Sequence, residues 1–315
     1  MEDISFLNTL KMKYNYSDKL TTALDKIIPK LIAFYGEEYK NLIQKAIAST
    51  RIIECNSYQP LSSVIKTLNP TPENKDKALI KENLKLASSV YLADPVIIYD
   101  DFLKTYIIKD IKRYIVLSHF HNLDSPRGLA TLTHELSKLV RSYTNEFKIE
   151  NDILTQKTGL KLATKQINKE NNQISLVLLN EQNTGLEAGI NSYDEEKITS
   201  SVIGGKYETF DYNLPKKVAL ILYERLRLKP LIVSSSILGN NHLQNEYDLE
   251  PGIFDSLTSL VDQAILEEEK NSNSEITKEE KEIIKEQLAR INQEIGNNII
   301  FYINANAIIH EPQMV

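Results

Sequence analysis

The stretch from Ser125 to Ser142, SPRGLATLTHELSKLVRS, has the spacing of an amphipathic helix. Positions three and four residues apart form one mostly apolar stripe that would face a core: Leu129, Leu132, Thr133, Leu136, Leu139 and Val140. Ser125 has the side chain of a helix N-cap, and Pro126 suits the first helical position because the N–H missing there has no partner inside a helix. The sequence therefore predicts a helix over residues 126–142.

The middle of this helix carries a pattern related to metal-dependent hydrolysis. In the pattern His-Glu-x-x-His, the two histidines bind zinc and the glutamate activates the attacking water. Here it reads His134-Glu135-Leu-Ser-Lys138, with lysine at the second ligand position. An ammonium has no lone pair for a metal, and deprotonation is costly near neutral pH because the ordinary lysine pKa is about 10.4. An ordinary surface ion pair between Glu135 and Lys138 is an alternative interpretation of the same residues.

Composition narrows the class of protein. The 315 residues, 42% of them hydrophobic, suffice for one large domain or two ordinary ones. A net charge of -6 gives no reason to expect nucleic acid or an anionic membrane as a partner. The single cysteine, Cys55, excludes an intrachain disulfide. The acidic N-terminus without an apolar run predicts a cytoplasmic protein, and the excess of Ile, Lys and Asn fits an AT-rich bacterial genome.

The first 92 residues have the patterns of helices. Leu20 to Tyr35 keeps helical spacing, with Ser17 or Asp18 as the cap, Gly36 as the end, and Pro29 at a kink or at the start of a second helix. Further helices are predicted at 39–53 and 78–92.

The pattern changes after Pro95. Short β-branched runs at 96–99 and 114–117 predict strands, the second leading by a short loop into the helix of His134. His119 and His121 follow the second run directly and would point to one face if the strand continues that far. Such a His-x-His pair near His134 is an alternative metal site. Residues 148–180 predict a β insertion with a turn at Asn171-Asn172.

The C-terminal part of the sequence has the patterns of helices. We predict helices at 214–226, 230–238 and about 249–267, and a polar loop at 267–275. Thr277 and Glu280 form a capping box that introduces a long charged helix to about Ile295. Residues 298–303 predict a strand or a buried segment.

A second motif lies downstream of His134, at the start of a predicted helix. Gly185-Leu186-Glu187-Ala188-Gly189-Ile190-Asn191, together with the pattern of His134, resembles bacterial zincin-like metallopeptidases of the gluzincin type over approximately residues 95–200. In that group the motif is Gly-Leu-x-Glu-Gly-x-[Thr/Asn], and its glutamate is the third zinc ligand. The resemblance places Ala188 at that ligand position, and Ala188 has no donor atom.

The resemblance implies a degenerate site. His134 is the retained ligand, Glu135 the vestigial general base, and Lys138 and Ala188 are the lost ligand positions. We expect an α+β, mostly helical, zincin-like fold with a small sheet beside the helix of His134. A helical region at 1–92 would precede a zincin-like domain at 93–315, with its β insertion at about 148–180 and a helical C-terminal part.

The functional expectation is an inactive pseudopeptidase without a metal cofactor, which binds a peptide or a protein. Two alternatives remain open. One is an active peptidase that holds zinc through His134 with His119 or His121. The other is an unrelated, mostly helical interaction protein in which the His134-Glu135 pair is accidental.

Overall fold

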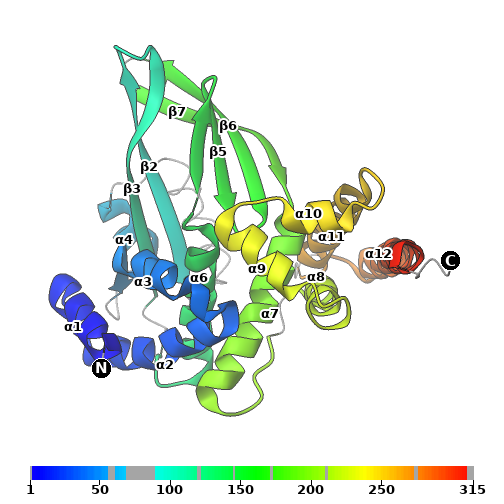
Figure 1. Cartoon of the computed structure of the whole chain (residues 1–315), viewed down its shortest axis with the longest axis horizontal. Coiled ribbons are helices and arrows are strands. Elements are labelled where there is room, and N and C mark those ends of the chain that lie inside the picture. Colours follow the sequence, from blue (N-terminus) through cyan, green and yellow to red (C-terminus); the bar gives the residue numbers. More distant parts are fainter. Residues whose placement is uncertain are drawn as a thin grey trace. The chain divides into compact units, whose positions relative to one another are not determined.

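The computed structural model describes residues 2–55, 61–68, 89–118, 122–144, 146–170, 173–209, 212–272 and 276–310. Figure 1 shows the helices and strands of the chain, which divides into two compact units. Unit 1 contains Met1–Gln156, Thr164–Leu179 and Asp194–Thr209, and unit 2 contains Lys157–Ala163, Asn180–Tyr193 and Phe210–Val315. Helices predominate beside two small sheets, which confirms the predicted α+β, mostly helical class.

The N-terminal part of unit 1 is helical up to Ala48. It contains α1 (Glu2–Tyr14), α2 (Asp18–Tyr35), a 3-10 turn (Glu37–Tyr39) and α3 (Lys40–Ala48). Ser17 caps α2 by accepting a hydrogen bond from Leu20 N at 3.0 Å, and Gly36 ends it with a φ of 123°. The helix continues through Pro29. The predicted apolar stripe is buried: Leu20, Leu24, Ile27, Ile28, Leu31, Ile32 and Tyr35.

A three-stranded sheet follows, in the order β1-β3-β2. Its strands are β1 (Thr50–Glu54), β2 (Ser89–Asp100) and β3 (Thr105–Leu117). β1 runs parallel and β2 antiparallel to β3, so the two predicted strands are confirmed as parts of longer ones.

Two helix predictions are wrong at their ends, because residues 50–53 and 89–92 pair with β3. Such pairing overrides local helical periodicity. The predicted domain boundary after residue 92 therefore falls inside β2. The preceding residues of the second predicted helix, 78–88, lie outside the described part of the chain.

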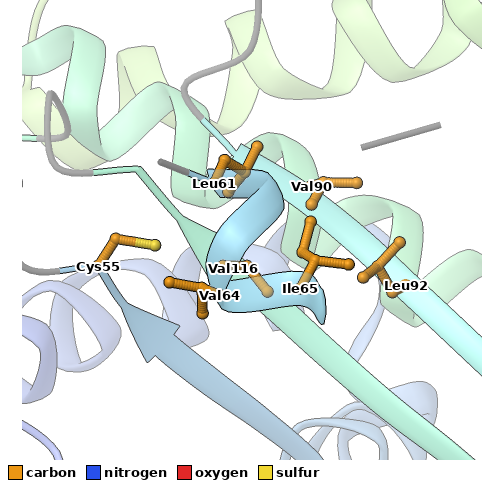
Figure 2. Close-up of a cluster of buried hydrophobic side chains, with 7 residues drawn as sticks. All are labelled: Cys55, Leu61, Val64, Ile65, Val90, Leu92 and Val116. Carbon is orange, nitrogen blue, oxygen red and sulfur yellow. The ribbon is translucent and has the colours of Figure 1, made fainter. Parts of the chain in front are cut away.

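Buried side chains join α4 (Leu61–Thr67) to this sheet (Figure 2). The cluster contains Cys55, Leu61, Val64, Ile65, Val90, Leu92 and Val116. Ile65 and Val116 have no exposed surface, so the centre of this cluster is closed to solvent and belongs to the core of unit 1.

The helix predicted around His134 is α6 (Pro126–Ser142). Ser125 Oγ accepts a hydrogen bond from Gly128 N at 3.0 Å, which confirms the N-cap. The whole predicted stripe is buried. A Cβ added at Gly128 would clash with the carbonyl of Asn122, so the loop entering α6 packs directly on the helix backbone.

The predicted β insertion forms a four-stranded sheet in the order β4-β5-β6-β7. Its strands are β4 (Phe147–Glu150), β5 (Ile153–Thr158), β6 (Lys161–Glu170) and β7 (Gln173–Gln182). Asn151 and Asp152 have φ values of 50° and 61° in the two-residue turn between β4 and β5, the conformation of a type I′ hairpin. The predicted turn at Asn171-Asn172 lies outside the described residues.

All the described elements after β7 are helical. Its elements are α7 (Thr184–Ile203), α8 (Asn213–Leu220), a π-helical turn (Ile221–Arg225), α9 (Lys229–Leu238), α10 (His242–Tyr247), α11 (Ile253–Asn271) and α12 (Lys278–His310). The capping box is confirmed, because Thr277 N donates to Glu280 Oε2 at 2.7 Å and Glu280 N donates to Thr277 Oγ1 at 3.2 Å.

Two predictions in this region are corrected. The polar loop predicted at 267–275 begins later, because α11 runs to Asn271. Residues 298–303 are helical and belong to α12. The buried residues Ile284, Ile291, Ile295, Ile299 and Tyr302 continue one helical stripe through them. In the described part of the chain, no helix combines the length and the apolar character needed to cross a bilayer.

Candidate functional site

His134 of α6 and Glu195 of α7 form a hydrogen-bonded pair within unit 1. His134 Nδ1 lies 2.8 Å from Glu195 Oε2, and their side chains are 23% and 13% exposed. A carboxylate only accepts, so Nδ1 carries the proton of this bond. In the neutral ring the lone pair is then on Nε2, the arrangement found in histidines that bind metals or act as bases. Glu195, which no sequence motif marks, lies two helical turns beyond Ala188.

Glu135 is buried and holds α6 against β2. Its Oε1 accepts a hydrogen bond from Ser89 Oγ at 2.9 Å, and its Oε2 accepts one from Tyr91 N at 2.9 Å. The side chain is 3% exposed. The N–H of Tyr91 thus points to a side chain of α6 and not to a neighbouring strand. Glu135 satisfies backbone and side-chain donors at the edge of β2, which is a structural role.

Lys138 lies beside the same carboxylate. Its Nζ is 3.7 Å from Glu135 Oε2, and its side chain is 25% exposed. The ammonium therefore offsets part of the charge of Glu135 at a position that is partly shielded from solvent. The pair is the predicted i, i+3 contact, but the burial of Glu135 distinguishes it from an ordinary surface pair.

A second charged pair fixes α6 against the C-terminal half of α7. Arg141 Nε lies 3.4 Å from Asp194 Oδ2, and neither side chain is exposed. Tyr35 OH donates to Asp194 Oδ2 at 2.8 Å. Burial, followed by the charge of Asp194, raises the pKa of Tyr35 well above its ordinary value, so the phenol remains a donor. Because Asp194 precedes Glu195, this network also sets the position of the residue that holds His134.

Tyr91 connects Glu135 to another buried carboxylate. Its hydroxyl donates to Glu146 Oε1 at 2.6 Å, and Arg113 Nε lies 2.8 Å from Glu146 Oε2. Burial raises the pKa of Glu146, while Arg113 and Tyr91 act in the opposite direction. Both carboxylates therefore anchor the start of β2 through one tyrosine.

The glycines of the second motif serve packing inside unit 2. A Cβ on Gly185 would clash with the carbonyl of Val261 in α11, and one on Gly189 would clash with the carbonyl of Pro215 in α8. Glu187, between them, is 5% exposed and accepts a hydrogen bond from Leu160 N at 2.8 Å. Close helix packing thus accounts for the two glycines.

The α7 residue that pairs with His134 is Glu195, and the assignment of Ala188 to a lost ligand position stays a prediction. Seven residues span about two turns, so the two positions share one side of α7.

Three of the residues expected at a zinc site lie together on α6 of unit 1. His134 offers one imidazole nitrogen, the ammonium of Lys138 lies beside the Glu135 carboxylate, and Glu135 accepts hydrogen bonds from β2. Among the residues described, no group of three or more His, Cys, Asp or Glu side chains is placed to hold a metal ion. His119 and His121, the alternative ligands, lie outside these residues.

The arrangement is therefore an oriented histidine beside a structural carboxylate and a lysine. Glu135, which the sequence pattern predicts as the general base, accepts hydrogen bonds from Ser89 and Tyr91 of β2. Comparison with protein-family models, curated proteins and solved structures gives no significant match.

Proposed function

We propose that this chain is a zincin-like metallopeptidase homologue without peptidase activity, which acts by binding a peptide or a protein. The order of elements supports the proposal, because β3 leads by a short loop into α6 with its His134-Glu135 pair, and α7 follows downstream. The motif around Gly185 adds to it through its sequence. Binding is the function that such a scaffold retains after its chemistry is lost.

The burial of Glu135 is the observation that carries the proposal. A general base must reach the water it activates. The Glu135 carboxylate is 3% exposed and accepts hydrogen bonds from Ser89 Oγ and Tyr91 N. Freeing it for catalysis would leave two donors at the start of β2 without this acceptor, which opposes a role as a base.

Lys138 supports the same conclusion. In a zinc site the divalent ion compensates the negative charge of its surroundings, and here an ammonium lies 3.7 Å from the carboxylate. The site thereby has a built-in cation where the family pattern has a second histidine.

Peptide cleavage provides the test. The full chain is incubated with a library of random peptides, with and without added zinc, and products are identified by mass spectrometry. We expect no products above those made by the Glu135→Gln variant. Cleavage that a chelator abolishes and that Glu135→Gln lacks would refute the proposal. Binding is measured on an immobilised array of the same peptides, where retention of defined sequences by the wild-type chain is expected.

An active metal-dependent peptidase is the second candidate, and the His134–Glu195 pair favours it. A carboxylate on Nδ1 is the usual partner of a metal-bound histidine. On this candidate, His119 or His121 would complete the site, and replacing both with alanine would abolish chelator-sensitive cleavage. If cleavage is absent from the wild-type chain, this candidate fails.

Restoring the family pattern tests the assignment of the lost ligands. The double variant Lys138→His with Ala188→Glu should acquire zinc affinity, measured by titration with zinc and a chromophoric competitor. Each single variant serves as the control, because two protein ligands hold zinc much more weakly than three. A correctly folded double variant without zinc affinity would show that Ala188 is not the ligand position.

A further inference from the structure

β7 is an open edge of the four-stranded sheet. Within the described strands it pairs with β6 alone, as the order β4-β5-β6-β7 requires (Figure 1). Val177, Leu178 and Leu179 are 48%, 56% and 55% exposed. Successive strand residues point to opposite faces, so both faces of β7 meet solvent as well as its edge. The outward N–H and C=O groups of such a strand are a template for pairing with another strand.

β2, one of the two edge strands of the other sheet, has features that obstruct such pairing. β2 contains Pro95, has a bulge between Val96 and Ile97, and donates its Tyr91 N–H to Glu135. Each of these features obstructs a further strand. β7 has no comparable protection, because residues 174–180 (ISLVLLN) include no proline and no charged side chain. An edge left open in this way is suited to a partner strand.

We propose that β7 pairs antiparallel with β7 of a second copy of this chain. A two-fold axis at Val177 would place Leu176 opposite Leu178 and Ile174 opposite Asn180. The seven residues from 174 to 180 span about 24 Å. Cross-strand pairs of apolar and β-branched residues stabilise such a contact. This pairing does not depend on the function proposed above.

Charge favours a second copy as the occupant. Glu181 is the single charged residue of β7, and its partner is Lys161 at 2.6 Å. For any two-fold axis between residues 176 and 178, Glu181 faces an uncharged residue of the other copy. Like charges directly opposite each other destabilise a strand pair, and self-pairing of β7 avoids them.

The β2–β3 hairpin adds exposed apolar residues near β6, the strand that pairs with β7. Lys169 Nζ of β6 lies 5.3 Å from the ring centroid of Tyr99, so the hairpin is a neighbour of β6. Phe102 and Leu103 at its turn are 92% and 59% exposed, and both backbone N–H groups donate to Asp100 Oδ1 at 2.9 Å.

Sedimentation velocity of the full chain from about 1 to about 100 µM tests the pairing. The wild-type chain should be a dimer in the upper part of this range. Leu178→Lys should raise the dimer dissociation constant at least about tenfold, because it places a charge inside the strand pair. Leu266→Lys on α11 is the control, since Leu266 is also 56% exposed, and it should leave the dimer unchanged. Circular dichroism verifies that both variants are folded.

Three sedimentation results would overturn the pairing. They are a monomeric wild-type chain at every concentration, an unchanged dimer in Leu178→Lys, and open-ended growth of the assembly with concentration. If Leu178→Lys does not fold, a cysteine pair replaces it. In a Cys55→Ala background, Val177→Cys should form a covalent dimer on oxidation at least about tenfold faster than Ile283→Cys, whose position is 55% exposed on α12. Equal rates would also overturn the pairing.

Discussion

The Nδ1 atom of His134 lies 2.8 Å from the Oε2 atom of Glu195, which joins the helix of the His-Glu pattern to α7. This contact gives the imidazole a fixed orientation and a defined tautomer. One residue along the chain from His134, Glu135 points to β2 and accepts from Tyr91 N. The two neighbours therefore have different roles, His134 as an oriented ring at a half-buried position and Glu135 as an anchor inside unit 1.

The tautomer of His134 is the first prediction. At alkaline pH the neutral ring should carry its proton on Nδ1, because Glu195 accepts there. Long-range proton–nitrogen correlation spectra of the labelled protein report the tautomer, and His134→Gln identifies the signal among the five histidines. Glu195→Ala should lower the Nδ1–H population, while Glu196→Ala should leave it unchanged. An Nδ1–H population that is unchanged in Glu195→Ala would contradict this orientation of the His134 ring.

Glu135→Gln should lower the free energy of unfolding by about 1–3 kcal/mol. Ser89 Oγ and Tyr91 N both donate to the carboxylate, and an amide would turn an NH₂ group toward one of these donors. Urea denaturation measures the change. The control is Glu282→Gln on α12, which also has a lysine three residues away but is 69% exposed, and it should have little effect. If Glu135→Gln were as stable as the wild-type chain, the hydrogen bonds from Ser89 and Tyr91 to Glu135 would contribute little to stability.

Replacement by alanine should have opposite effects on stability at two glycines of α7 and at one glycine of α12. Gly185→Ala and Gly189→Ala should each destabilise the protein by about 1–3 kcal/mol, because the added methyl meets the carbonyl of Val261 or of Pro215. Gly296→Ala should stabilise it by about 0.5–1 kcal/mol, since Gly296 lies inside a helix with open space around it. Thermal unfolding of the three variants distinguishes these effects. Tolerance of alanine at both α7 positions would contradict the close packing.

Cys55 should react slowly with a disulfide reagent such as Ellman's reagent. Burial raises the pKa of the Cys55 thiol, and the thiolate is the reactive form. The folded state therefore keeps the proton to higher pH than the unfolded state, so the contribution of this group to stability is lost as pH rises above about 8.5. Rates of reaction with the reagent across pH, with and without denaturant, check that the folded protein protects the thiol and that its pKa is higher in the folded state. Equal rates in the two conditions would mean that Cys55 is accessible.

Local signals in the sequence were sufficient for α6 and for α12 as far as about Ile295. The N-cap Ser125 and the capping box of Thr277 with Glu280 lie within a few residues of the helices that they start, and each apolar stripe follows one helical period. The strand or buried segment predicted at 298–303 was wrong in its secondary structure, because a run rich in isoleucine also suits a strand. The buried stripe from Ile284 to Tyr302 shows that the helical period continues through it.

Contacts distant in sequence were not predictable. Thr50 pairs with Arg113 and Ser89 with Leu117, so β1 and the first residues of β2 form where the local pattern indicated the ends of helices. Glu195 has no motif of its own, and its role follows from the Arg141–Asp194 pair that fixes α7 against α6. The residues His134, Glu135 and Lys138 were identified from sequence, but the burial of Glu135 depends on β2 and was not.

Zinc content tests the central claim most directly. The untagged full chain is purified without chelators and its metals are measured by mass spectrometry, beside the His134→Ala variant. A site in which Lys138 lies beside an engaged Glu135 should contain far less than one zinc per chain, with no difference between the two proteins. One tightly held zinc per wild-type chain that is lost in His134→Ala would contradict the account.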